Sequence, residues 1–308
     1  MNTLRKTEGL IAAPFTPMKA DKTLNLEMIG AYARRLHASN VAGAFICGTT
    51  GEGMSLTLDE RQKVAERWIA SAPKGLRVIV HVGHASLADS CALAKHAASA
   101  GADSIACMAP FFFKPTGVEG LVDWCEQIAA TASKLPFYYY HMPSMTGFHV
   151  AVSDFLKIAA GRIPNLAGIK YTFEDLEDYE RCLKFDNGRY DVLFGRDELL
   201  LSSLKLGARG AVGSTYNFAT QLYHEIIALY KKGDGKRAEE LQATAVRMIA
   251  AFVNSGAHPI AAFKRFMSRI GVDCGPTRLP LPCPTDGQIA ALDEALKASG
   301  ALDWMVKP

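Results

Sequence analysis

Residues 166–172 read LAGIKYT, an apolar run that ends in a lysine, a tyrosine and a threonine. Small and aliphatic residues at consecutive positions are typical of a strand that is buried on both faces. Lys170 stands where such a strand passes into a loop. Two interpretations are open at this point: a solvated charge at a strand end, or an amine held at the mouth of a protein core.

Similar apolar segments recur along the chain at intervals of roughly 20 to 35 residues. The eight strand-like segments are 9–14, 43–48, 77–82, 104–109, 136–141, 166–170, 191–195 and 210–214. Stretches with helical spacing separate them, which predicts parallel strands joined by helices, and eight such units predict an α/β protein of the (β/α)8 TIM barrel type. The alternative, an open doubly wound sheet, usually has a glycine-rich phosphate loop after its first strand. Residues 15–23, FTPMKADKT, form no such loop.

One predicted helix, near 58–71, shows both a start signal and two faces. Thr57 followed three residues later by Glu60 is the sequence of a capping box. The helical spacing places Val64, Trp68 and Ile69 on an inner face, and Glu60, Arg61, Glu66 and Arg67 on an outer face.

The alternating pattern breaks at KKGDG, residues 231–235. Helical stretches follow at 235–255, 257–270 and 286–299, with the proline-spaced connector GPTRLPLPCP before the last of them. We therefore predict a catalytic barrel over 1–231 and a C-terminal helical region over 232–308 that packs on the barrel.

Composition excludes several classes of protein. The 308 residues are 49% apolar and 21% charged with a net charge of +3, a balance typical of a soluble globular protein. No basic block indicates a nucleic-acid or membrane surface, the first residues lack the apolar core of a secretion signal, and no apolar run is long enough to span a bilayer. The seven cysteines are scattered, which predicts small core residues in a reducing, cytoplasmic protein. They are Cys47, Cys91, Cys107, Cys125, Cys182, Cys274 and Cys283.

Polar side chains stand directly after five of the predicted strands. In a barrel, the carboxyl ends of the strands and the loops that follow them form one open face. Hydroxyls, a phenol, an amine and two carboxylates are therefore expected to meet in a single polar pocket. These residues are Thr49 and Thr50 in GTTGEG, Tyr140 and His141, Lys170 and Thr172, Asp197 and Glu198 in GRDE, and Ser214.

Each of these motifs also has a purely structural interpretation. GTTGEG, residues 48–53, could be a tight turn into a helix, although its N–H groups could equally form an anion nest. Asp197 and Glu198 could place negative charge in the first turn of a helix, where anions are stabilised, and Ser214 could have no functional role. In the run Tyr138–Tyr140, alternation places the first and third rings on one face, so that one or two can face the barrel lumen.

For Lys170, chemistry favours the reactive interpretation. A lysine of ordinary pKa is neutral in only about one molecule in 2,500 at pH 7. An apolar barrel mouth disfavours the charged form, lowers the pKa and supplies a nucleophilic amine. Such an amine condenses with a ketone to an iminium, an electron sink for C–C cleavage that needs no metal. His81 and His84 have no acidic partner in the sequence nearby, and no metal or nucleotide motif competes with this hypothesis.

The ordered motifs GTTGEG, YYYHMP, GIKYT, FGRDE and AVGSTYN resemble those of the N-acetylneuraminate lyase and dihydrodipicolinate synthase superfamily. The resemblance extends from about residue 9 through the TRLPL segment at 277–281. Within the superfamily, GTTGEGMSLT, HVGHASL, APFFFKP, PFYYYHMP and GSTYN are most similar to the animal-type N-acetylneuraminate lyases.

This resemblance implies a class I aldolase that cleaves N-acetylneuraminate reversibly to N-acetylmannosamine and pyruvate, without cofactor or metal, as a homotetramer. Lys170 would form the Schiff base, Tyr140 would transfer protons, and Thr49 and Thr50 would hold the pyruvate carboxylate. The positions that would bind the sugar are Thr172, Gly195, Asp197, Glu198 and Ser214. Two alternatives stay open: a sibling aldolase for another 2-keto-3-deoxy sugar acid, and a non-catalytic sensor of pyruvate or a sugar acid.

The sequence departs from the synthases of the superfamily at three places. Pro143 is followed by Ser144 and Met145, whereas the synthases have an arginine there for a second carboxylate. Phe112 stands in place of the second relay tyrosine that a neighbouring subunit delivers, and His141 replaces the more usual asparagine. Synthase activity is therefore not expected.

Overall fold

The apolar segments of the sequence form a closed barrel of parallel strands. The computed structural model describes residues 6–305; each strand pairs with the next along the chain, and β8 closes onto β1. The strands are β1 (Gly9–Ala12), β2 (Gly43–Ile46), β3 (Arg77–His81), β4 (Ser104–Met108), β5 (Phe137–His141), β6 (Leu166–Tyr171), β7 (Asp191–Phe194) and β8 (Gly210–Gly213). The predicted (β/α)8 fold is confirmed, with strand ends within about two residues of those expected.

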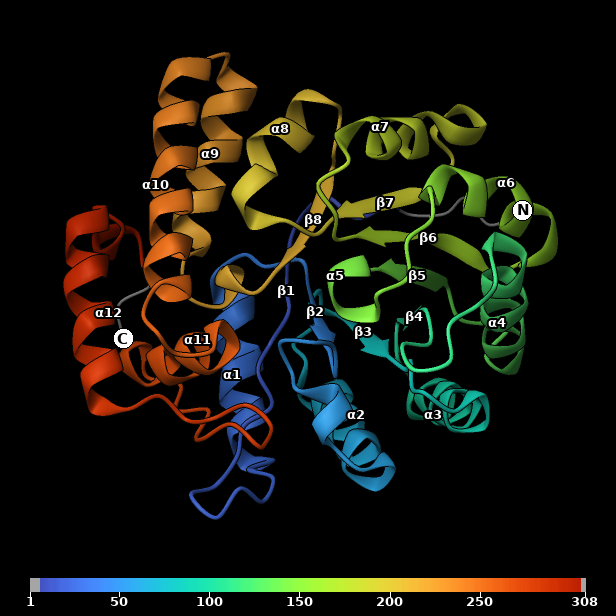
Figure 1. Ribbon diagram of the computed structural model, residues 1–308, viewed down its shortest axis with the longest axis horizontal. Helices are drawn as coiled ribbons and strands as arrows, with labels where there is room; N and C mark the ends of the chain where they lie inside the picture. The colour runs from blue at the N-terminus through green and yellow to red at the C-terminus, as the bar shows by residue number, and fades with distance from the viewer. Residues whose placement is uncertain (1–5, 306–308) are drawn as a thin grey trace.

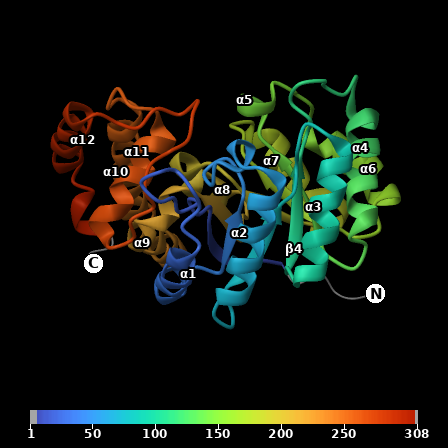
Figure 2. The ribbon, with the colours of Figure 1, turned by 90° about the horizontal axis from the view of Figure 1, so that it is seen from below.

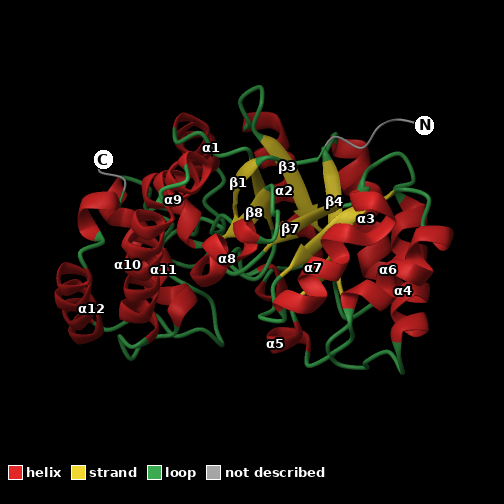
Figure 3. Cartoon of the chain, turned by 90° about the horizontal axis from the view of Figure 1, so that it is seen from above, coloured by secondary structure: helices red, strands yellow, loops and turns green. Residues whose placement is uncertain are grey.

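Helices follow the strands and surround the barrel, as Figure 3 shows with strands in yellow and helices in red. They are α1 (Glu27–Ala38), α2 (Leu58–Ser71), α3 (Leu87–Ala100), α4 (Val118–Thr131), α6 (Val152–Arg162), α7 (Leu176–Lys184), α8 (Leu200–Lys205) and α9 (Thr220–Lys232). A short helix, α5 (Pro143–Thr146), follows β5 and lies in front of the barrel strands in Figure 1.

Helix α2 begins at the predicted cap. The Glu60 backbone N–H donates to Thr57 Oγ1 (3.2 Å), and the Thr57 N–H donates to Glu60 Oε2 (3.0 Å). Val64 and Trp68 are buried on the inner face. The capping box and the inner face are therefore confirmed.

The predicted outer face of α2 is wrong at Arg61, whose side chain is buried. The guanidinium donates to the carbonyl oxygens of Gly83 (2.9 Å) and His81 (2.6 Å) at the end of β3. Backbone carbonyls that leave the barrel at a strand end need donors, and the long side chain of Arg61 supplies them. Helical periodicity classifies Arg61 only as a charged residue, and it gives no information about the backbone carbonyls to which the side chain donates.

The three consecutive tyrosines of β5 alternate as predicted. Tyr138 and Tyr140 face the barrel lumen, where they pack with Phe45 and Leu193. Tyr139 belongs to the layer between the barrel and its helices. Tyr140 is paired in register with Lys170 of β6, so the backbone pairing places the phenol beside the amine.

Three further helices, α10 (Gly235–Val253), α11 (Pro259–Phe266) and α12 (Asp286–Ser299), form the C-terminal region. Figures 1 and 2 show them together at one side of the molecule, opposite α3, α4 and α6. Gln242 of α10 donates to the carbonyl oxygens of Asp197 (3.1 Å) and Glu198 (3.0 Å), so this region supports the loop after β7. The helices match the predicted stretches, and the division of the chain at residues 231 and 232 stays a prediction.

All seven cysteines are free thiols, and five of them are buried. Cys91 is partly buried and Cys283 is exposed, so the prediction of core positions is wrong for Cys283. None of the helices within residues 6–305 has the length and apolar character that crossing a bilayer would require.

A buried ion pair joins the C-terminal region to the loop after β2. Lys264 Nζ lies 2.6 Å from Glu52 Oε1, and both side chains are at most 1% exposed. The other oxygen of Glu52, Oε2, accepts the backbone N–H of Arg278 (2.9 Å). Glu52 has a left-handed backbone (φ 54°), a conformation that is uncommon for residues other than glycine. The ion pair and the hydrogen bond therefore stabilise a turn that is otherwise unfavourable.

We predict that Lys264→Met lowers the free energy of unfolding by about 3–5 kcal/mol, because it leaves a buried carboxylate without its partner. Urea denaturation followed by the fluorescence of the three tryptophans measures this loss. The double variant Glu52→Gln, Lys264→Met should recover most of it, since no uncompensated charge remains.

The exposed pair of Lys63 and Asp59 provides a matched control for the buried pair. Lys63 Nζ lies 2.7 Å from Asp59 Oδ2, a distance similar to that of the buried pair, but the two side chains are 54% and 69% exposed. Lys63→Met should change stability by less than about 1 kcal/mol. Equal losses in Lys63→Met and Lys264→Met would contradict the structural role of the buried pair.

Candidate active site

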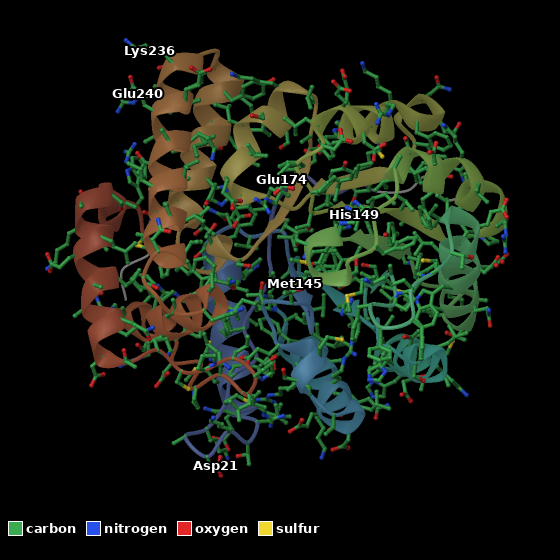
Figure 4. All side chains as sticks on the ribbon, viewed as in Figure 1. Asp21, Met145, His149, Glu174, Lys236 and Glu240 are labelled. Atoms are coloured by element: carbon green, nitrogen blue, oxygen red, sulfur yellow. The ribbon has the colours of Figure 1, made fainter. Side chains whose placement is uncertain are left out.

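The predicted site residues lie together at the carboxyl ends of the strands. A cavity of about 230 Å³ is lined by Thr49, Thr50, Tyr140, Lys170, Thr172, Gly195, Asp197, Glu198 and Ser214. In Figure 4, Met145, which also lines this cavity, is labelled in the middle of the view, whereas Lys236 and Glu240 lie at the far end of α10. All nine residues therefore line one cavity, although their roles are matters of chemistry rather than position.

The loop after β2 presents the hydroxyls of Thr49 and Thr50 to the cavity. The Glu52 N–H donates to the Thr49 carbonyl (3.1 Å), and the Gly53 N–H donates to the Gly48 carbonyl (3.0 Å), which closes a tight turn. The hydroxyls of Thr50 and Ser214 lie 2.6 Å apart across the barrel mouth. Adjacent hydroxyls on such a turn suit an anion such as a carboxylate.

Lys170 is buried, with 5% of its surface exposed. Its Nζ lies 4.0 Å from the centroid of the Phe45 ring and 4.0 Å from that of the Tyr140 ring. Burial lowers the pKa of the amine to about 7, and the negative charge of Asp197 partly offsets this shift. In a large fraction of the molecules, the amine of Lys170 is therefore unprotonated and nucleophilic near neutral pH.

The ring of Tyr140 lies beside the lysine, with Lys170 Nζ over its face. Its hydroxyl is 3.3 Å from Thr49 Oγ1 and donates to Met142 Sδ (2.6 Å). Burial raises the pKa of Tyr140 to about 12, and the contact with Thr49 partly offsets this. The phenol thus holds its proton at neutral pH and has a neighbouring hydroxyl through which protons can pass.

Asp197 is buried with one oxygen occupied and one available. Its Oδ2 accepts the backbone N–H of Thr215 (3.1 Å) and the Thr215 hydroxyl (2.5 Å), whereas Oδ1 has no hydrogen-bond partner among the described residues. Burial, with a further contribution from Glu198, raises the pKa of Asp197 to about 7. A Cβ at position 213 would lie 2.0 Å from Oδ1, so glycine is required there. A buried and unpartnered acceptor calls for a ligand that donates a hydrogen bond.

Thr172 and Gly195 meet where they directly follow the neighbouring strands β6 and β7. Thr172 Oγ1 is buried and has no hydrogen-bond partner in the part of the chain described. A Cβ at position 195 would lie 2.0 Å from this oxygen, so the glycine makes room for the threonine side chain. The cavity therefore contains a second unsatisfied polar atom that a polar ligand could pair.

Several lining residues were missed by the sequence reasoning. Met142 and Met145 come from the segment after β5, Arg196 lies between two predicted residues, and Ile260 and Phe263 come from α11. Arg196 pairs with Glu174 (2.8 Å) and lies 3.7 Å from Glu198. The GRDE motif could have indicated Arg196, but no sequence signal shows that α11 returns to the barrel mouth.

His81 and His141 hold structural positions, and the prediction that His141 joins the polar pocket is wrong. His81 Nδ1 contacts the Cys47 carbonyl (3.1 Å), and His141 Nδ1 contacts the Tyr139 hydroxyl (3.2 Å). Burial lowers the pKa of His141 to about 4, and its ring packs with Tyr171 rather than lining the cavity. Within residues 6–305, no cluster of three or more histidine, cysteine or acidic side chains could hold a metal ion.

Comparison with known proteins places this site in a family. The model of the dihydrodipicolinate synthetase family matches residues 6–299. The N-acetylneuraminate lyase of Danio rerio is 41% identical over 286 residues, which cover 91% of this chain and 93% of the relative. That of Mus musculus is 39% identical over 308 residues and covers 99% of this chain and 95% of the relative.

A solved structure, that of Proteus mirabilis N-acetylneuraminate lyase, is similar with a TM-score of 0.93 and 40% identity. The match covers 97% of this chain and 100% of that chain. These similarities confirm the resemblance drawn from the motifs. The chain therefore belongs to the dihydrodipicolinate synthetase family, in the group that contains the N-acetylneuraminate lyases.

Proposed function

We propose that this protein is a Schiff-base aldolase that cleaves N-acetylneuraminate reversibly to N-acetylmannosamine and pyruvate. The observation that carries the proposal is the buried amine of Lys170, with a pKa of about 7, beside the phenol of Tyr140 in a polar cavity. Relatives at about 40% identity that are N-acetylneuraminate lyases support the substrate. The electron sink forms on Lys170 itself, so the proposal needs no external cofactor.

The first step joins the substrate to Lys170. The Nζ lone pair attacks the ketone carbon of the open-chain sugar acid; one proton is taken up, one water leaves, and the nitrogen becomes a protonated iminium. In this pose Thr49 and Thr50 hold the carboxylate next to the reacting carbon. Rigid strand ends supply the alignment that this condensation requires.

The second step breaks the C3–C4 bond. As the Tyr140 phenol passes its own proton to Thr49, and Thr49 passes one on to the substrate carboxylate that it holds, the proton of the C4 hydroxyl moves to Tyr140. C4 then becomes the aldehyde of N-acetylmannosamine, and the electron pair of the bond moves toward the iminium to leave a neutral enamine. Protonation of C3 and addition of water then release pyruvate and restore the amine. Asp197 and Glu198 would accept hydrogen bonds from the sugar hydroxyls, together with Thr172, Gly195 and Ser214.

Borohydride reduction in the presence of pyruvate tests the covalent chemistry. The proposal expects a permanent mass increase on the peptide that contains Lys170, because reduction of the iminium leaves a stable secondary amine. An unmodified chain would favour a non-catalytic sensor of sugar acids instead.

A substrate panel tests the sugar specificity. We expect cleavage of N-acetylneuraminate to exceed that of its N-glycolyl form and of 2-keto-3-deoxygluconate. A preference for 2-keto-3-deoxygluconate would instead support the sibling aldolase, which shares the same lysine and differs only in the sugar-binding residues.

The pKa of Lys170 predicts the pH dependence of the condensation. Only the neutral amine attacks, so the initial rate of pyruvate trapping should rise as the pH increases through about 7 rather than through 10.5. Asp197→Asn removes a charge that raises the pKa of Lys170, so its midpoint should move to lower pH. Single-turnover trapping across pH 5–10 measures both midpoints. A rise above pH 9, or an unchanged midpoint in Asp197→Asn, would contradict this account.

We also propose that the protein is a cytoplasmic homotetramer. Phe112 and Phe113 after β4 are 74% and 85% exposed, and such paired exposed aromatics are characteristic of a contact with another subunit. Free cysteines throughout the chain suit a reducing compartment. Sedimentation should show a tetramer that dissociates in Phe112→Ser, Phe113→Ser, and cell fractionation tests the compartment. A monomeric wild-type chain would contradict the proposed assembly.

A further inference from the structure

The lysine nitrogen lies in a corner formed by two aromatic rings. Besides Tyr140, the face of Phe45 from β2 is 4.0 Å from Nζ. Phe45 is 1% exposed and meets the Tyr140 ring edge-on, with centroids 5.4 Å apart and planes at 73°. The proton-transfer chemistry described above uses the hydroxyl of Tyr140 and leaves Phe45 without a role.

We propose that Phe45 is a further catalytic residue, whose ring face stabilises the positive charge that develops on the Lys170 nitrogen in the iminium. The inference rests on the proposed Schiff-base chemistry and adds a component to it. An aromatic face attracts a cation within about 6 Å of its centroid, and the attraction is strongest where water is excluded. Both conditions hold at this ring.

The charge changes along the reaction explain why such a ring is useful. The nitrogen is neutral as the free amine, carries a full positive charge in the protonated iminium, and is neutral again in the enamine. Burial favours the neutral amine and so prepares the nucleophile, but the same burial penalises the iminium that must follow. A ring face offsets that penalty.

A carboxylate at this position would also stabilise the iminium, but its full charge and its hydrogen bond would raise the pKa of the free lysine much more than a ring face does. It could also take the proton that the iminium must keep. Phe45 has no acceptor for that proton and no hydrogen bond to satisfy. Interaction with the charged intermediate more than with the bound ketone is the kind that accelerates the reaction.

Replacement of Phe45 by phenylalanines with one, two and three ring fluorines provides the test, since fluorination weakens the ring's attraction for cations with little change in size. We expect the equilibrium for pyruvate iminium formation and the kcat/KM for cleavage to fall stepwise, roughly tenfold or more over the series, because both are measured from the free, neutral amine. Phe45→Leu should lose at least as much. The midpoint for pyruvate trapping should move to lower pH, because the ring also favours protonated lysine.

Phe155 of α6 provides the matched control. It is also fully buried against a tyrosine ring, that of Tyr139 at 4.6 Å, but it lies in the layer outside the barrel. The same fluorine series there should leave kcat/KM, the iminium equilibrium and the trapping midpoint unchanged, and melting temperatures should be similar in both series.

The outcomes separate this inference from the proposed function. Failure of the wild-type chain to trap pyruvate would contradict the Schiff-base chemistry itself. Normal wild-type trapping with a flat fluorine series, while Phe45→Leu loses activity, would show that Phe45 acts only through packing and would overturn the inference.

Discussion

Lys170→Ala is expected to abolish cleavage of N-acetylneuraminate, with a loss of at least about 10⁴-fold in kcat, the order seen when the nucleophile of a covalent enzyme is removed. Without the amine no iminium forms, and the C3–C4 bond has no electron sink. Borohydride with pyruvate should then leave the mass of the chain unchanged. Activity is measured by coupled detection of released pyruvate.

Lys170→Met separates loss of chemistry from loss of structure. It keeps most of the buried side-chain volume and removes the amine, which is buried in the folded chain and solvated in the unfolded one. At pH 7 the folded wild type bears the cost of lowering this pKa from 10.5 to about 7. The variant should therefore be at least as stable as wild type at pH 7, with less advantage above pH 10.5, where lysine is neutral in both states.

An inactive Lys170→Met variant with an undiminished melting temperature would assign the loss to chemistry alone. Wild-type cleavage by either variant would contradict the role of Lys170. A melting temperature at pH 7 well below that of wild type would instead show that the amine contributes to folding, against the direction of its pKa shift.

The spacing of the apolar segments predicted the barrel, and the place of the polar residues at the strand ends predicted the rim of its cavity. Strands buried on both faces are short apolar runs, and parallel strands bring the residues after them to one face of the molecule. Thr49, Lys170 and Ser214, which are far apart in the sequence, could therefore be placed together without any knowledge of contacts. Only residues at or just after the carboxyl ends of strands can be placed in this way.

The features that could not be predicted depend on tertiary contacts, about which sequence periodicity carries no information. Arg61 is buried because two carbonyls at the end of β3 need its guanidinium, and Phe263 reaches the cavity because α11 returns to the barrel. Phe45 lies inside a strand, and the sequence does not distinguish it from other core aromatic residues. Only the structure shows that Lys170 Nζ lies over its ring. Each was missed because its role is defined by tertiary packing.

Tyr140→Phe is expected to slow cleavage by about 10²–10⁴-fold, the usual contribution of a positioned acid–base group. The change removes the hydroxyl but keeps the ring, which lies 4.0 Å from Lys170 Nζ. Pyruvate trapping should therefore be lowered far less than cleavage. Comparison of single-turnover trapping with steady-state cleavage measures the two effects separately.

The raised pKa of Tyr140 determines how the phenol can act. At a pKa of about 12 it is protonated at neutral pH, so it can take the proton of the C4 hydroxyl only as its own proton moves on. Thr49 Oγ1, 3.3 Å away, is placed to receive that proton, and Thr49→Val should slow cleavage as well. If Tyr140→Phe lowered trapping and cleavage equally, the phenol would act in iminium formation rather than in bond cleavage, and the relay through Thr49 would be wrong.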